Sequence, residues 1–105
     1  MKALGRSTSA TADVLEVFLS SAEPIWGLKI VKLTQRPAGS VYPILERLEN
    51  LGWTSSQWDS DADRAGPRRR LYSLSTAARA EAHAAVAEVR RRELRTAASR
   101  VATTA

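Results

Sequence analysis

The apolar residues in the first half of the chain recur at the three- and four-residue spacing of amphipathic helices. Along the first such stripe the apolar residues are Val14, Leu15, Phe18 and Leu19. They predict a helix that begins near Ser9 or Thr11, and the hydroxyl of either residue is suited to cap it. The helix is expected to end at Glu23–Pro24, because a proline disfavours helical geometry in the residue before it.

A second, shorter helix is predicted over Gly27–Leu33. Its apolar contacts are expected from Leu28, Ile30, Val31 and Leu33. Lys29 and Lys32 fall between these positions and are expected to point outward. The segment Gln35-Arg36-Pro37 breaks the pattern and predicts a turn.

The third segment carries the clearest helical period in this half of the chain. The stripe consists of Val41, Ile44, Leu45, Leu48 and Leu51. Gly52 follows it, where a helix often ends on a glycine. Pro43 leaves two alternatives open for the start. If Ser40 is the N-cap, Pro43 lies in the first turn, where no hydrogen bond is lost; if the helix begins near Pro37, Pro43 must bend it.

The period then changes to one typical of β-strands. Residues 53–59 and 68–74 are short and rich in aromatic or alternating apolar residues, and they flank a polar segment that contains Gly66 and Pro67. This pattern predicts a β-hairpin with a long tip. In the second strand, Arg70, Tyr72 and Leu74 should share one face.

A final alanine-rich helix is predicted from Ser75 or Thr76 to about Val101. Its apolar positions form an uneven stripe of Ala82, Val86, Val89, Leu94 and Val101. The step from Val89 to Leu94 is out of phase with the rest. The fold class is therefore mainly α with a small β-hairpin, in the order of a winged helix-turn-helix with an added C-terminal helix.

Composition narrows the classes of function. The chain has 105 residues, no cysteine and a formal net charge of +5. Without cysteine there are no disulfides, thiolate metal ligands or thiol nucleophiles. No apolar run approaches a membrane span, and no signal segment is visible, so we expect a soluble, cytoplasmic protein without a membrane partner. The basic charge favours an anionic partner, with nucleic acid first.

In a winged helix the second helix of the turn unit enters the major groove, and the hairpin reaches the flanking backbone or the minor groove. The helix of about Ser40–Leu51 is the predicted recognition helix, and its first exposed residues include Ser40 and Tyr42, with Arg47 further along. The predicted hairpin carries Arg64 and the run Arg68–Arg70. Arginine is well suited to both a phosphate ridge and a narrow minor groove.

Four stretches together resemble the PadR family of bacterial transcriptional regulators. They are Ile25-Trp26-Gly27-Leu28-Lys29-Ile30, residues 39–49 (GSVYPILERLE), Leu51-Gly52-Trp53 and residues 66–75 (GPRRRLYSLS). The resemblance runs from about Val14 to about Arg79, in the same order and at the same separations. It implies a dimeric winged-helix repressor that binds promoters, often its own, and that is sometimes relieved by a small molecule.

What the resemblance implies for individual residues can be stated by number. The expected DNA-binding residues are Arg36, Ser40, Tyr42, Pro43, Arg47, Arg64, Arg68, Arg69 and Arg70. Arg36 stands where the family commonly has a leucine. Since an arginine cannot be buried unpaired, either the turn is exposed or Arg36 contacts a phosphate. No aromatic residue follows Tyr72, so the tryptophan-based ligand site of some family members is not expected.

Dimerisation is expected because one recognition helix reaches only a few base pairs. The expected organisation is a polar lead-in (1–9), a winged-helix domain (10–75), a C-terminal dimerisation helix (76–101) and a tail (102–105). The partners are then double-stranded DNA, a second copy of the chain and, as the resemblance allows, a small-molecule effector of unknown identity. The operator should be a pseudo-palindrome.

Other interpretations stay open at this point. The same helices would also suit a winged-helix module that binds a protein, or an effector sensor without strong DNA binding. An enzyme is not expected, because no catalytic constellation, cofactor motif or metal-ligand set is apparent. The single histidine, His83, is expected at the surface, as are the arginines of residues 90–100. Trp26, Trp53 and Trp58 are expected to pack in the core and hairpin.

Overall fold

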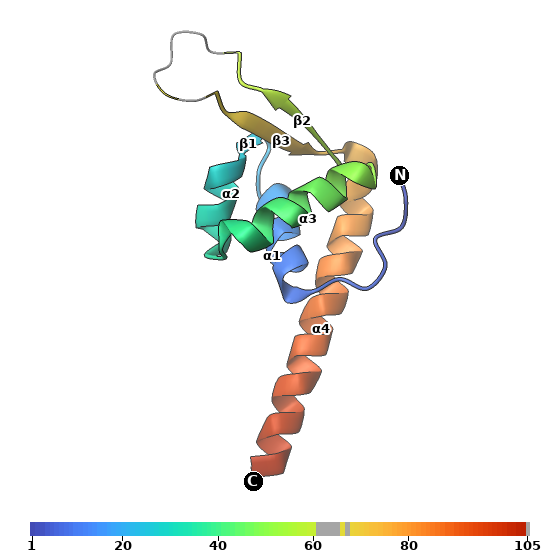
Figure 1. Ribbon diagram of the computed structural model, residues 1–105. Helices are drawn as coiled ribbons and strands as arrows, with labels where there is room; N and C mark the ends of the chain where they lie inside the picture. Colours follow the sequence, from blue (N-terminus) through green and yellow to red (C-terminus); the bar gives the residue numbers. More distant parts are fainter. Residues whose placement is uncertain (61–65, 67, 105) are drawn as a thin grey trace.

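The computed structural model of the protein describes residues 1–60, 66 and 68–104, and it has the predicted winged helix-turn-helix architecture (Figure 1). The elements are α1 (Ser9–Leu19), β1 (Ile25–Trp26), α2 (Gly27–Thr34), α3 (Ala38–Asn50), β2 (Thr54–Trp58), β3 (Arg70–Leu74), a 3₁₀ turn η1 (Thr76–Ala78) and α4 (Arg79–Thr104). The three strands form one antiparallel sheet in the order β1-β3-β2.

Helix α1 is capped by Thr8, whose hydroxyl accepts a hydrogen bond from the amide of Thr11 at 3.2 Å. The prediction that Ser9 or Thr11 is the cap was therefore wrong. Thr8 takes this role because it is the residue with extended backbone geometry, whereas Ser9 and Thr11 are already helical. The helix ends at Leu19, before the predicted boundary at Glu23–Pro24, and the Arg79 guanidinium donates to the Leu19 carbonyl at 3.2 Å.

Helices α2 and α3 are joined by a tight turn in which Gln35 has a left-handed backbone conformation (φ 58°). Helix α3 begins directly after Pro37, so the earlier of the two predicted starts is the observed one. Pro43 is consequently inside the helix and cannot donate to the carbonyl of Gly39. Gly39 is exposed, and water can therefore satisfy that carbonyl.

Strand β1 was not predicted. The backbone pairs Ile25 with Tyr72 and Trp26 with Leu71, which adds a third strand to the expected hairpin. Two residues are too few to show a period of two, so the apolar pattern gives no signal for such a strand. The strand fixes the start of α2 against the sheet.

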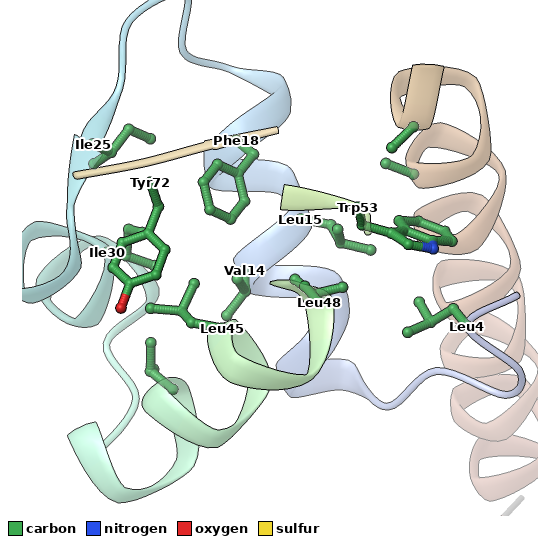
Figure 2. Packing of buried hydrophobic residues seen from close by; sticks show 13 residues of the cluster. Leu4, Val14, Leu15, Phe18, Ile25, Ile30, Leu45, Leu48, Trp53 and Tyr72 are labelled. Atoms are coloured by element: carbon green, nitrogen blue, oxygen red, sulfur yellow. The ribbon is translucent and has the colours of Figure 1, made fainter. Parts of the chain in front are cut away.

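The hydrophobic core lies where α1, α2 and α3 meet below the sheet (Figure 2). Leu15, Ile30, Leu45 and Leu48 have no measurable exposure. Tyr72 reaches the same cluster from β3. The predicted core stripe of α3 is confirmed, but Leu33 of α2 is exposed rather than packed.

The N-terminal residues, expected to be a polar lead-in, pack against the domain. Leu4 is buried beside Trp53 in the core cluster (Figure 2). The Trp53 indole N–H donates to the Lys2 carbonyl at 2.7 Å, and the Lys2 amide donates to the Leu51 carbonyl at 2.8 Å. These contacts attach the segment to the end of α3.

Helix α4 has two different faces. Ala82 and Val89 are buried against the domain, whereas Leu94 is 70% exposed. This explains the out-of-phase step in the sequence, because Leu94 belongs to a second face of the helix. The last turns of α4 extend beyond the other elements (Figure 1), and the molecule measures 60 × 28 × 21 Å. Within the described ranges, no helix has the length and apolar content needed to cross a membrane.

Candidate nucleic-acid interface

The N-terminal half of α3 presents an exposed surface. Ser40, Tyr42 and Pro43 are all exposed, while Val41 beside them is fully buried. The period of α3 explains this division, since the residues between the core positions face outward. The structure therefore places three of the predicted DNA-binding residues on one accessible part of the helix.

Tyr42 is held in place by a close approach to Gly27. A Cβ atom at Gly27 would lie 3.0 Å from Cε1 of Tyr42 and 3.3 Å from Cε1 of Tyr72. A larger residue at this position would therefore displace the Tyr42 ring. The Tyr42 side chain remains 41% exposed, so one edge of the ring packs while its remainder stays accessible to a partner.

The wing, which we define as residues 54–74, carries the described arginines Arg68, Arg69 and Arg70. Arg68 is exposed, and its guanidinium lies 5.5 Å from the centre of the Trp58 ring. Arg69 is half-buried, with its guanidinium 4.0 Å from the centre of the Trp26 ring. Arg64, which was also predicted to bind DNA, lies outside the described residues.

Arg70 is the most strongly held of the three. Its Nε donates to the Ser56 hydroxyl at 2.9 Å, and its guanidinium lies 3.4 Å from a carboxylate oxygen of Glu49. As predicted, it shares a strand face with Tyr72, which is buried. Burial also raises the pKa of the Tyr72 phenol, which therefore stays protonated at neutral pH.

Residues 26 and 27 bring α3 and the wing together. Trp26 contacts Arg69 of the wing, and the next residue, Gly27, contacts Tyr42 of α3. The exposed part of α3 and the described arginines are thus neighbours in space. We call Ser40, Tyr42, Pro43, Arg68 and Arg69 together the α3–wing surface.

Arg36 and Arg47, the two remaining candidates, are both bonded within the protein. The Arg47 guanidinium donates to the Leu4 carbonyl at 2.6 Å. Arg36 Nε donates to a carboxylate oxygen of Asp13 at 2.6 Å. The sequence interpretation of Arg36 considered an exposed turn or a phosphate contact, and it did not consider this ion pair.

The charge around the α3–wing surface is mixed. Lys29 and Lys32 are exposed on α2, as predicted, and Glu46 is exposed on α3. Backbone phosphates would be attracted by the lysines and the wing arginines and repelled by Glu46. Glu46 is therefore expected to lie away from the phosphate backbone.

The sequence interpretation missed the role of Trp26. All three tryptophans were expected in packing roles, but only Trp53 is a core residue, while Trp26 is half-buried under Arg69 and Trp58 is 50% exposed. A signal was present, because Trp58 and the wing arginines lie in the two predicted hairpin strands. Nothing in the sequence links Trp26 to Arg69, since the pairing depends on the unpredicted strand β1.

A hollow of about 610 Å³ lies between α1 and α2, with Val17, Ile25 and Leu33 in its lining. Its two carboxylates, Asp13 and Glu16, are already paired with arginines. Among the described residues, no group of histidine, aspartate or glutamate side chains is arranged to hold a metal ion.

Comparison with protein families gives a match to the transcriptional regulator PadR-like family over residues 14–84, which is more than half of the chain. Comparison with curated proteins finds no match.

Several solved structures share the fold. A probable transcriptional regulator from Pseudomonas aeruginosa has a TM-score of 0.63 and 28% sequence identity, over 97% of this chain and 81% of that one. A PadR family transcription regulator from Clostridium difficile has a TM-score of 0.56 and 20% identity, over 89% and 96% of the two chains. The circadian clock associated protein Pex from Anabaena has a TM-score of 0.64 and 19% identity, over 83% and 80%.

Proposed function

The chain belongs to the PadR-like family of transcriptional regulators, and from this premise we propose that it is a homodimeric repressor that binds a pseudo-palindromic operator through the α3–wing surface. Regulators of this family bind DNA and are not enzymes. The observation that carries the proposal is the contact of residues 26–27 with both Tyr42 and Arg69. It supports a single surface in which a recognition helix and a basic wing act together.

The proposed docking puts the N-terminal half of α3 in the major groove. Ser40 and Tyr42 carry hydroxyl groups there, and both are exposed. A hydroxyl can donate to a phosphate oxygen or a base edge, and the N-terminal end of the helix dipole favours an anion. Pro43 lies next to Tyr42, where it offers an apolar contact to the same groove.

The wing is proposed to lie on the flanking backbone or in the minor groove. Arg68 and Arg69 supply positive charge at this position, and Arg64 is proposed to add to it. Since the rings of Trp58 and Trp26 hold Arg68 and Arg69, less side-chain entropy is lost on binding.

Homodimerisation through α4 is supported by its outward face. A line of exposed residues runs along the helix at alternating four- and three-residue steps: Ala80, Ala84, Ala87, Arg91, Leu94, Ala98 and Val101. This spacing matches the contact seam of paired helices. A two-fold dimer would place two recognition helices about one turn of DNA, roughly 34 Å, apart. Occupation of a promoter by such a dimer would exclude polymerase, which is the basis for proposing repression.

The experiment that tests the docking surface compares matched arginine variants by fluorescence anisotropy with duplex DNA from upstream of the gene. Arg68→Ala should lower the slope of log affinity against log salt by about 0.9 for each phosphate that the protein no longer neutralises. Arg95→Ala removes the same charge from α4 and should leave the slope unchanged. Tyr42→Ala should weaken binding by about tenfold or more, since a hydrogen bond to a charged group contributes roughly 1.5–3 kcal/mol.

Either of two results would contradict the proposal. If Arg68→Ala and Arg95→Ala change the salt slope equally, the wing does not contact phosphate. If wild-type binding to every duplex is absent or insensitive to salt, the surface is better explained as a protein-interaction module.

A further inference from the structure

The carboxylate of Asp13 joins two arginines from distant parts of the chain. Its Oδ2 accepts from Nε of Arg36 at 2.6 Å, and its Oδ1 accepts from the guanidinium of Arg90 at 2.7 Å. Arg36 lies in the turn before α3, Asp13 on α1 and Arg90 on α4. One side chain therefore connects the start of the proposed recognition helix with the proposed dimerisation helix.

Arg90 is itself held by several partners. It contacts the carboxylate of Glu16 at 2.9 Å and that of Glu93 at 3.0 Å. Glu93 also accepts a hydrogen bond from the hydroxyl of Ser9 at the beginning of α1. Because four groups on α1 and α4 share these bonds, Arg90 has a defined position relative to α1.

The connection is partly shielded from solvent. The side chains of Asp13, Arg90 and Arg36 are 27%, 32% and 35% exposed. Burial alone would raise the pKa of Asp13, but the hydrogen bonds from Arg90 and then Arg36, together with their charges, outweigh burial and hold the pKa below its usual value. Asp13 is accordingly ionised at neutral pH, which keeps both bonds charge-assisted.

The start of α3 has few other constraints of this kind. Its N-cap is Pro37, which offers no side-chain cap bond. The amides of Ser40 and Val41 both donate to the Pro37 carbonyl, at 2.9 and 3.1 Å. The ion pair of the preceding residue, Arg36, is thus well placed to determine where α3 begins.

We infer that Arg36 is a positioning residue that acts on DNA binding through Asp13, and that the Arg36–Asp13–Arg90 bridge couples the position of α4 to that of α3. The inference rests on the proposed function for its DNA readout. It assigns Arg36 a role distinct from direct phosphate contact. It also means that a change at the proposed dimer helix alters the affinity of the proposed recognition helix.

The test measures duplex affinity for Arg36→Met, Arg90→Met, Asp13→Asn and the double variants, with Arg95→Met as the charge-matched control. Arg36→Met and Arg90→Met should each weaken binding by about three- to tenfold, as expected for a residue that couples two sites through a network of side chains. Arg95→Met should have little effect. The effect of Arg90→Met should disappear in the Asp13→Asn background, because the bridge is already broken there.

Asp13→Asn is the most discriminating variant. It makes the protein more positive, which by itself would strengthen binding to DNA. Weaker binding with an unchanged salt slope would therefore come from altered positioning of α3. If Asp13→Asn binds as tightly as wild type or more tightly, and Arg36→Met lowers the salt slope by about 0.9, Arg36 contacts phosphate and the inference is wrong.

Hydrogen exchange of the free protein gives a second readout that does not depend on DNA. Arg90→Met should accelerate exchange at the amides of Ser40 and Val41, whereas Arg95→Met should not. Unchanged exchange at both amides would show that α4 and α3 are not coupled. If wild type binds no duplex but the exchange result is as expected, the proposed function fails and the mechanical link stands.

Discussion

Trp26 shows how a single aromatic residue can prepare a basic side chain for binding. Its ring lies 4.0 Å from the guanidinium of Arg69, and its backbone pairs with Leu71 in the sheet. The ring restricts the guanidinium before a partner arrives, and its face attracts the positive charge. Trp26 therefore contributes to the α3–wing surface without being required to touch DNA.

We predict that Trp26→Leu weakens duplex binding and that Trp26→Phe largely restores it. A cation–π contact contributes about 0.5–2 kcal/mol, which corresponds to a roughly two- to thirtyfold loss of affinity. Phenylalanine retains a ring face, whereas leucine does not. Anisotropy at one salt concentration measures the difference, and thermal unfolding of both variants controls for stability. Equal affinity of the two variants would show that the ring has no such role.

Asp13 gives the protein a pH-dependent contribution to stability. Since its pKa is lower in the folded than in the unfolded chain, it stabilises the fold above the unfolded pKa, and this contribution is lost as the pH falls through the folded value. Asp13→Asn should therefore be less stable than wild type at pH 7.

The difference in unfolding free energy between Asp13→Asn and wild type should shrink on acidification, between about pH 4 and pH 2. Urea unfolding at several pH values measures it. A difference that stays constant over this range would mean that the charge of Asp13 does not stabilise the fold.

Individual contacts were only partly predictable from the sequence. The exposure of Ser40 and Tyr42 followed from the helical period, because that period also identifies the buried Val41. The partner of Arg36 did not, since Asp13 is 23 residues away and no local pattern joins them. Long-range ion pairs depend on how helices are packed, which periodicity does not determine.

At the scale of elements, α3 and α4 differ in how clearly their sequences predicted them. The stripe of α3 has one partner, the core, and its prediction is confirmed. The stripe of α4 appeared uneven because two faces are superimposed: Ala82 and Val89 pack on the domain, whereas Leu94 points elsewhere. An irregular period in a long helix can thus indicate two separate contact faces.

We predict that Leu94→Glu converts the protein to a monomer. Leu94 is 70% exposed in the single chain, so the substitution should not disturb the fold, but a carboxylate buried between two helices would be strongly unfavourable. Sedimentation velocity measures the change in mass, and Thr96→Glu, on another exposed side of α4, should remain a dimer. A dimer that persists in Leu94→Glu would exclude this face of α4 as the interface.

At the scale of the whole molecule, the order of elements was predictable because each long element carries its own period. Strand β1 and the packed N-terminal segment were not. The segment around Leu4 has no repeating pattern, and its attachment depends on Trp53 and Leu51 at the other side of α3. The family match over residues 14–84 agrees with the part of the chain in which these patterns are clearest.

In the proposed assembly, two copies of the chain present two α3–wing surfaces to one duplex. The most direct measurement is fluorescence anisotropy of a labelled duplex from upstream of the gene, titrated with the full chain across a salt series. We predict preference over a scrambled duplex and a log–log salt slope at least as steep as about −3.5, as expected if Arg68 and Arg69 of both subunits each neutralise one phosphate. Binding that is absent, or insensitive to salt and sequence, would contradict the proposed assembly on DNA.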